Sequence, residues 1–213
     1  RPIGIGVQGL ADLFNKFEYA YGSDEARELN KRIFETIYYN SLDESCKLAQ
    51  KYGQYESFNG SPMSQGITQW HLWGLSEKDL LMEFNWKELI ENIKKYGLRN
   101  SLLTTVMPTA STSQIMGNTE SIEPYLSNVF TRTTLAGEFP ILNKNLVEYL
   151  MKNNLWSNDM KNKIIAYKGS IQNIAEIPQK IREVYKTAFE IYQKDIITLA
   201  ADRGPFVCQS QSM

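Results

Sequence analysis

The feature that most restricts the fold is a short unit near the middle of the chain. An apolar and β-branched run occupies residues 102–107, which is typical of a buried strand. A hydroxyl-rich turn follows over 108–113, and helical spacing resumes at about Thr112. A buried strand joined to a helix by a short turn is a building unit of α/β domains. Since helical periodicity dominates elsewhere, we expect a helix-rich α/β fold.

The remaining secondary structure is predicted from periodicity, caps and breakers. Helical spacing predicts helices over residues 23–52, 143–152, 157–168 and 178–202. Capping patterns at 76–79 and 85–88 open a short helix and then a longer one that Gly97 ends. Strands are expected over 128–135 and 206–208, and the aromatic-rich stretch 54–75 is expected to be an ordered loop.

Composition excludes several classes of partner. The 213 residues carry 23 basic and 24 acidic side chains, so there is no electrostatic footprint for nucleic acid. No apolar run approaches the roughly 18 residues of a membrane helix, and no signal peptide opens the chain. We therefore expect a soluble, cytoplasmic protein without a membrane partner. Two cysteines and a single histidine, His71, also predict no metal site.

The turn at 108–113 is a candidate phosphate site. Its residues are Pro108, Thr109, Ala110, Ser111, Thr112 and Ser113. A turn between a strand and a helix directs backbone N–H groups at one spot, and the hydroxyls can add further donors to phosphate oxygen. The donors are all neutral, which favours the moderate affinity suited to a substrate. The alternative is that the hydroxyls only cap a helix and complete a turn.

Several longer stretches resemble one enzyme family. The first is Arg-Pro-Ile-Gly-Ile-Gly-Val-Gln-Gly-Leu-Ala-Asp at 1–12, and the others lie at 98–103, 107–115, 117–124, 137–139, 173–178, 202–206 and 209–212. In this order, they resemble the large, catalytic subunit of the eukaryotic type of class I ribonucleotide reductase. The resemblance implies part of a ten-stranded α/β barrel built from two five-stranded halves. On that basis residues 1–213 are a partial barrel domain from the later half, without the effector-binding N-terminal domain, and the chain is a piece of a longer protein.

The resemblance also implies an activity. The family reduces ribonucleoside diphosphates to deoxyribonucleoside diphosphates through a thiyl radical on a cysteine. Thr109, Ala110, Ser111 and Thr112 match its substrate-diphosphate loop. The family's Asn-x-Cys-x-Glu segment and redox cysteines have no match here. We therefore expect no catalytic residue in this chain and no activity from the chain alone.

Other reactive residues are expected to be structural. Cys46 lies in a predicted helix and Cys208 in a predicted strand, so both are interpreted as packing residues. Tyr38 and Tyr39 resemble the family's radical-relay pair in type only, because their helical context differs. His71 is interpreted as a loop residue. Glu120 and Glu123, three positions apart, could share a helix face, but a role in organising the turn is favoured.

Partners and cofactors come from the resemblance alone. It implies a ribonucleoside diphosphate substrate, a small subunit with a metal–tyrosyl radical, a large-subunit homo-oligomer, and ATP or deoxynucleotide effectors bound outside the matched segments. No cofactor is expected in this chain. Two alternatives remain for the chain itself: a non-enzymatic module that binds a phosphate ligand, and a helical scaffold.

Overall fold

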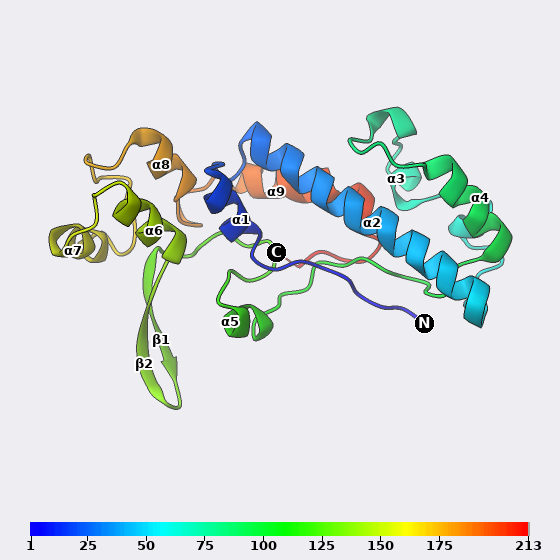
Figure 1. Cartoon of the computed structure of the whole chain (residues 1–213), viewed down its shortest axis with the longest axis horizontal. Helices are drawn as coiled ribbons and strands as arrows, with labels where there is room; N and C mark the ends of the chain where they lie inside the picture. The colour runs from blue at the N-terminus through cyan, green and yellow to red at the C-terminus, as the bar shows by residue number, and fades with distance from the viewer. Residues whose placement is uncertain (213) are drawn as a thin grey trace. The chain divides into compact units, whose positions relative to one another are not determined.

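The computed structural model describes residues 1–212, apart from the side chains at positions 132 and 134. The chain divides into two compact units. Unit 1 contains Arg1–Val7, Arg27–Pro108 and Ile197–Met213 as far as residue 212, and unit 2 contains Gln8–Ala26 and Thr109–Ile196. Figure 1 shows the course of the chain.

Helices dominate the described residues. The α-helices are α1 (Leu10–Phe17), α2 (Asp24–Tyr52), α3 (Gln69–Leu72), α4 (Trp86–Tyr96), α5 (Thr112–Met116), α6 (Lys144–Lys152), α7 (Asn158–Ala166), α8 (Gln179–Val184) and α9 (Gln193–Arg203). Three short 3-10 helices are η1 (Pro62–Gln65), η2 (Glu77–Asp79) and η3 (Gly204–Phe206). The strands β1 (Val129–Thr134) and β2 (Gly137–Leu142) form an antiparallel pair. None of the described helices is long and apolar enough to cross a membrane.

The long helix α2 confirms the prediction for residues 23–52. The Ser23 hydroxyl accepts a hydrogen bond from the Ala26 N–H, and Gly53 ends the helix by donating its N–H to the Ala49 carbonyl. The apolar positions that predicted the helix form its buried stripe. They include Phe34, Tyr38, Leu42 and Ala49, and Cys46 is buried as well.

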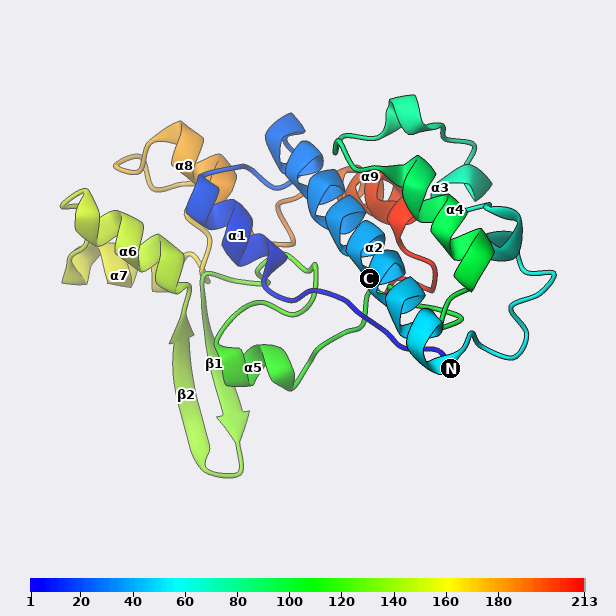
Figure 2. The ribbon, with the colours of Figure 1, turned by 45° about the vertical axis from the view of Figure 1, so that its right-hand side comes forward.

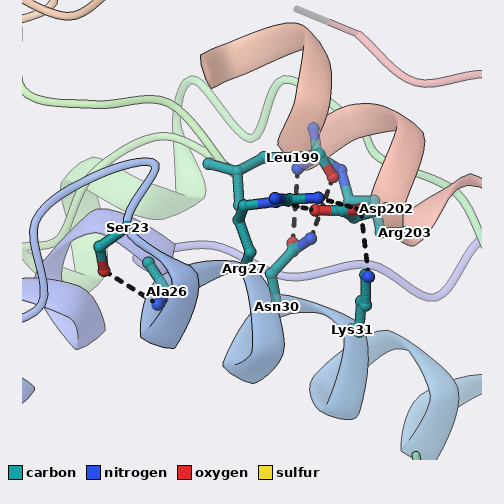
Figure 3. A network of polar contacts seen from close by, with 8 residues as sticks. All are labelled: Ser23, Ala26, Arg27, Asn30, Lys31, Leu199, Asp202 and Arg203. Atoms are coloured by element: carbon teal, nitrogen blue, oxygen red, sulfur yellow. Dashed lines mark hydrogen bonds and ion pairs between the residues drawn. The ribbon is translucent and has the colours of Figure 1, made fainter.

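A polar network connects α2 with α9 inside unit 1. Asp202 accepts a hydrogen bond from Arg27 Nε over 2.7 Å and lies 3.3 Å from Lys31 Nζ (Figure 3). Beside it, Asn30 Nδ2 donates to the Leu199 carbonyl, and the guanidinium of Arg203 lies fully buried over the ring of Phe34. Buried charge of this kind is tolerated only where it is hydrogen-bonded.

The segment 102–107 is extended, but it is bridged rather than built into a continuous strand. Thr104 pairs in parallel with Ile5, and Val106 pairs in parallel with Gln211. The predicted buried strand is therefore confirmed only in part: residues 103–106 are buried and have two parallel neighbours, but they form isolated bridges, and Leu102 and Met107 are exposed. The strand predicted at 206–208 is wrong, because η3 occupies Gly204–Phe206 and the bridge falls later, at Gln211. Phe206 and Val207 are buried all the same, which is why their apolarity suggested a strand.

Unit 2 is built around an aliphatic core beneath α6, α7 and α8. The core contains Leu146, Leu150, Ile164, Ile171 and Ile174, with Met160, Ile177, Ile181, Val184 and Tyr185. Asn143 caps α6 and Ser157 caps α7 through side-chain oxygens that accept backbone N–H bonds. The predictions for 143–152 and 157–168 are confirmed by these two helices.

One helix prediction needs correction. The single helix expected over 178–202 is wrong: α8 ends at Val184 and α9 begins at Gln193. The chain breaks because the N–H of Thr187 donates to the Glu190 carboxylate and the N–H of Ala188 donates to the Tyr125 carbonyl. These two N–H groups therefore cannot donate to the carbonyls four residues earlier, as a continuous helix would require.

The strand predicted at 128–135 is confirmed by β1, but its partner β2 was not expected. Val129 pairs with Leu142 and Thr134 with Gly137, and two residues form the loop. Pro140 lies within β2. The side chains of this strand are mostly exposed, so the segment lacks the alternation that identifies a half-buried strand. Figures 1 and 2 both show the hairpin projecting beyond α6.

The stretch 54–75 is ordered as expected, but it contains η1 and α3 in addition to loop. Trp70 is buried and packs edge-on against Trp86, while Tyr55 and Phe58 pack against each other. The 85–97 helix is confirmed by α4, with Asn85 as N-cap and Gly97 as C-cap. The short helix α1 was not predicted.

Candidate phosphate-binding site

The predicted turn leaves the buried extended segment at Pro108 and enters α5 at Thr112, as expected (Figure 2). Ala110, Ser111 and Thr112 are exposed, and Thr109 is half-buried. Within the part of the chain that the structure describes, the N–H groups of these three exposed residues donate to no protein acceptor. The N–H groups that come next are used: Ser113 donates to the Thr109 carbonyl and Ile115 to the Ser111 carbonyl. The turn therefore presents three consecutive free backbone donors.

Thr109 has an unusual backbone conformation. Its φ is 54°, in the left-handed region that β-branched residues rarely occupy. Its hydroxyl accepts a hydrogen bond of 2.7 Å from the N–H of Ser121, which itself has a φ of 44°. Because the Ser121 N–H occupies an acceptor position on the oxygen, the Thr109 hydroxyl keeps its proton to donate elsewhere.

Buried polar atoms without partners gather behind the turn. Among the described residues, the side-chain oxygens of Ser113, Asn118, Thr119 and Ser121 have no hydrogen-bond partner although they are buried. Each such atom costs about 1–3 kcal/mol when it is left unsatisfied. All four atoms belong to residues within nine positions of the chain, 113–121.

Asp12, on α1, anchors the segment that follows α5. Its buried carboxylate accepts hydrogen bonds from the Thr119 N–H (2.7 Å), the Tyr125 hydroxyl (2.5 Å) and Asn145 Nδ2 (2.9 Å). Burial, together with the bond to Asp12, raises the pKa of Tyr125, so this phenol stays protonated and donating. Sequence reasoning missed Asp12 as a site residue, although it lies within the matched stretch 1–12.

The start of α1 also approaches the turn. The N-cap Gly9 donates its N–H to the Thr119 carbonyl, and a Cβ at Gly9 would lie 3.1 Å from the side chain of Asn118. One residue earlier, Gln8 Oε1 accepts a hydrogen bond of 2.9 Å from the Thr112 hydroxyl. Two segments more than 100 positions apart in the chain thus form one site within unit 2.

The site carries no basic side chain of its own between residues 109 and 121. Lys144 donates to the Gly117 carbonyl, at the C-terminal end of α5 rather than at its free N–H groups. The arrangement can therefore hold an anion through neutral amides and hydroxyls. Such a site binds more weakly than a cluster of lysine and arginine would.

Each of the two cysteines has its own contacts within unit 1. Cys46 is buried on α2, as expected, and burial raises the pKa of its thiol. Cys208 lies in a bend after η3, not in a strand, and its sulfur accepts hydrogen bonds from the N–H groups of Leu103 and Thr104. Both are free thiols.

The tyrosine pair Tyr38 and Tyr39 has the packing role that was predicted. Tyr38 is buried and accepts a hydrogen bond from the Gln69 N–H, and Tyr39 stacks on Phe84 at 4.3 Å between ring centroids. His71 is part of a capping box with Thr68 at the start of α3, so it is a helix residue rather than the loop residue expected.

Glu120 and Glu123 form a turn and do not share a helix face. The Glu123 N–H donates to the Glu120 carbonyl over 2.8 Å, in agreement with the favoured role in the turn. Among the residues that the structure describes, no three His, Cys, Asp or Glu side chains gather closely enough to hold a metal ion.

Comparison with known proteins assigns the chain to a family. A family profile described as "Ribonucleotide reductase, barrel domain" matches residues 1–213. The chain therefore belongs to the ribonucleotide reductase barrel-domain family, and its helix-rich α/β fold is part of that barrel.

Curated relatives are similar in sequence over the full length of this chain. It is 54% identical to the ribonucleoside-diphosphate reductase large chain of Cryptosporidium parvum, and 56% identical to the large subunit from Plasmodium falciparum (isolate Dd2). Each match covers 100% of this chain and 26% of the relative, so the chain spans about a quarter of their length. A solved structure, the Actinobacillus ureae class Id ribonucleotide reductase alpha subunit, matches with a TM-score of 0.74 and 27% identity, covering 100% of this chain and 32% of that one.

Proposed function

We propose that this chain is part of the large subunit of a ribonucleoside-diphosphate reductase, an oxidoreductase that makes deoxyribonucleoside diphosphates for DNA synthesis. The names of the relatives support this proposal, since the sequences of these relatives match the chain from end to end. The whole enzyme acts in the cytoplasm.

Within that enzyme, residues 109–112 hold the diphosphate of the substrate. The observation that carries this assignment is the row of three free N–H groups at Ala110, Ser111 and Thr112. The Thr109 hydroxyl adds a fourth donor, because the Ser121 N–H leaves its proton free. These four neutral donors, with the Thr112 hydroxyl as a fifth when it is not bonded to Gln8, suit the several oxygens of a diphosphate.

The chemical step needs groups that this chain does not supply. Neither Cys46, buried on a helix, nor Cys208, bonded to backbone amides, matches the family's redox segment. The chain therefore positions the phosphate end of the substrate while the radical chemistry takes place elsewhere in the large subunit. A small subunit supplies the metal–tyrosyl radical, large subunits associate with one another, and ATP and deoxynucleotides act at effector sites outside this chain.

Substitution of Thr112 tests the assignment. Thr112→Val removes the hydroxyl and keeps the shape of the side chain. In the full-length subunit assayed with its small subunit, we expect KM for the ribonucleoside diphosphate to rise about tenfold, because a hydrogen bond to a charged group contributes about 1.5–3 kcal/mol. Thr36→Val, at a half-buried position of α2, is the matched control. An unchanged KM in Thr112→Val would contradict the proposal.

A further inference from the structure

Gln8 makes one hydrogen bond to the turn at 108–113. The hydroxyl of Thr112 donates to Gln8 Oε1 over 2.9 Å, while its distance to the alternative acceptor, the Thr109 carbonyl, is 3.4 Å. Gln8 is half-buried and Thr112 is exposed. The shorter bond therefore defines the direction of the threonine proton, which points toward Gln8.

That direction conflicts with binding an anion. A threonine hydroxyl has one proton, so it cannot donate to Gln8 and to a phosphate oxygen at the same time. If Thr112 is to serve as a donor to the substrate, its proton must be released from Gln8.

The glutamine side chain can release this proton by rotating its terminal amide in place. Its amide carries an oxygen acceptor and an NH2 donor of nearly equal size, and a half-turn of the amide exchanges them. With the NH2 facing Thr112, Gln8 donates to Oγ1 and the hydroxyl proton is free for the phosphate. Among the described residues, no other hydrogen bond holds the Gln8 amide in one orientation.

We propose that Gln8 is a positioning residue for the substrate diphosphate: its amide accepts the Thr112 proton in the free enzyme and turns to donate when the diphosphate binds. This inference rests on the proposed function of residues 109–112. It assigns the start of α1 a part in substrate binding that acts through Thr112 and not through direct contact with the reacting ribose.

Two substitutions in the full-length subunit, assayed with its small subunit, separate this role from simple packing. Gln8→Met fills similar space but neither donates nor accepts, so KM for the ribonucleoside diphosphate should rise about five- to tenfold, with the effect in KM rather than in kcat. Gln8→Glu has nearly the shape of glutamine, but an ionised carboxylate only accepts. It should raise KM further than Gln8→Met, because it retains the Thr112 proton and adds negative charge beside the diphosphate.

The same substitutions in a Thr112→Val background test the route of action. Gln8→Met should then add less than a twofold change in KM, because there is no hydroxyl left to position. Thermal unfolding of each variant verifies that the protein is folded.

The possible failures are distinguishable. If Thr112→Val raises KM and Gln8→Met does not, the role of Gln8 is wrong and the proposed function stands. A Gln8→Glu variant with a KM near that of the unaltered enzyme would show that only shape matters, which also overturns the inference. An undiminished effect of Gln8→Met in the Thr112→Val background would show that Gln8 does not act through Thr112. If Thr112→Val itself has no effect, the proposed function fails first.

Discussion

At the scale of single residues, the site combines strain with unsatisfied polar groups. Thr109 and Ser121 both have positive φ and are joined by one hydrogen bond. Backbone outliers of this kind cost on the order of 1–3 kcal/mol each and persist where the surrounding structure imposes them. Here the strained pair leaves the Thr109 hydroxyl proton free for a ligand. A simple helix cap would not require this conformation, whereas the proposed diphosphate site would use it.

Asp12 supplies the anchor that holds the strained segment in place. Asp12→Asn replaces a carboxylate oxygen by an NH2 group, which then faces donors from Thr119, Tyr125 or Asn145. We expect a loss of about 1–3 kcal/mol in the free energy of unfolding, because a buried donor is left without an acceptor. Denaturant unfolding of the full-length subunit measures it.

Asp159→Asn is the matched control for Asp12→Asn. It makes the same chemical change on a side chain that is 76% exposed, where an ion pair contributes less than about 1 kcal/mol. Equal losses from the two variants would show that the Asp12 contacts do not stabilise the site.

At the scale of elements, the contact between α2 and α9 depends on the charge of Asp202. Burial opposes ionisation of this carboxyl, but the hydrogen bond from Arg27 and the charge of Lys31 outweigh it and lower the pKa of Asp202. A carboxyl with a lowered folded pKa stabilises the fold above its unfolded pKa, which is about 3.9, and loses that contribution as the pH falls through the folded value.

Asp202→Asn tests the contribution of this ion pair. The variant should be less stable than the unaltered protein at pH 7, and the difference should shrink as the pH is lowered below about 4. Free energies of unfolding measured across this range give the comparison. A difference that is constant with pH would contradict the role of the ionised carboxylate.

Elements with local signals were predictable from the sequence, and those fixed by distant contacts were not. The Asn85 cap and the Gly97 stop identified α4, and helical spacing identified α6, because each signal lies within the helix or beside it. The break between α8 and α9 depends on the carbonyl of Tyr125, which is remote in sequence. Similarly, the turn at 109–112 could be predicted, whereas the contact of Gln8 with Thr112 and that of Asp12 with Thr119 are long-range hydrogen bonds.

At the scale of the whole molecule, the chain contains an incomplete set of parallel segments. Within the described residues, the buried segment around Thr104 and Val106 has one parallel neighbour at Ile5 and another at Gln211. This arrangement, in a chain about a quarter as long as its relatives, fits a part of the family's barrel. Along the chain, the turn at 108–113 comes directly after the central one of these three segments, two residues beyond Val106.

The most direct test of the central claim is a crystal structure of the full-length large subunit with a bound ribonucleoside diphosphate. We predict that the diphosphate oxygens lie within hydrogen-bonding distance of the N–H groups of Ala110, Ser111 and Thr112, with the Thr109 hydroxyl as a further donor. The matching nucleoside should leave this turn empty. A diphosphate bound elsewhere, with residues 109–112 making no contact to it, would contradict the account.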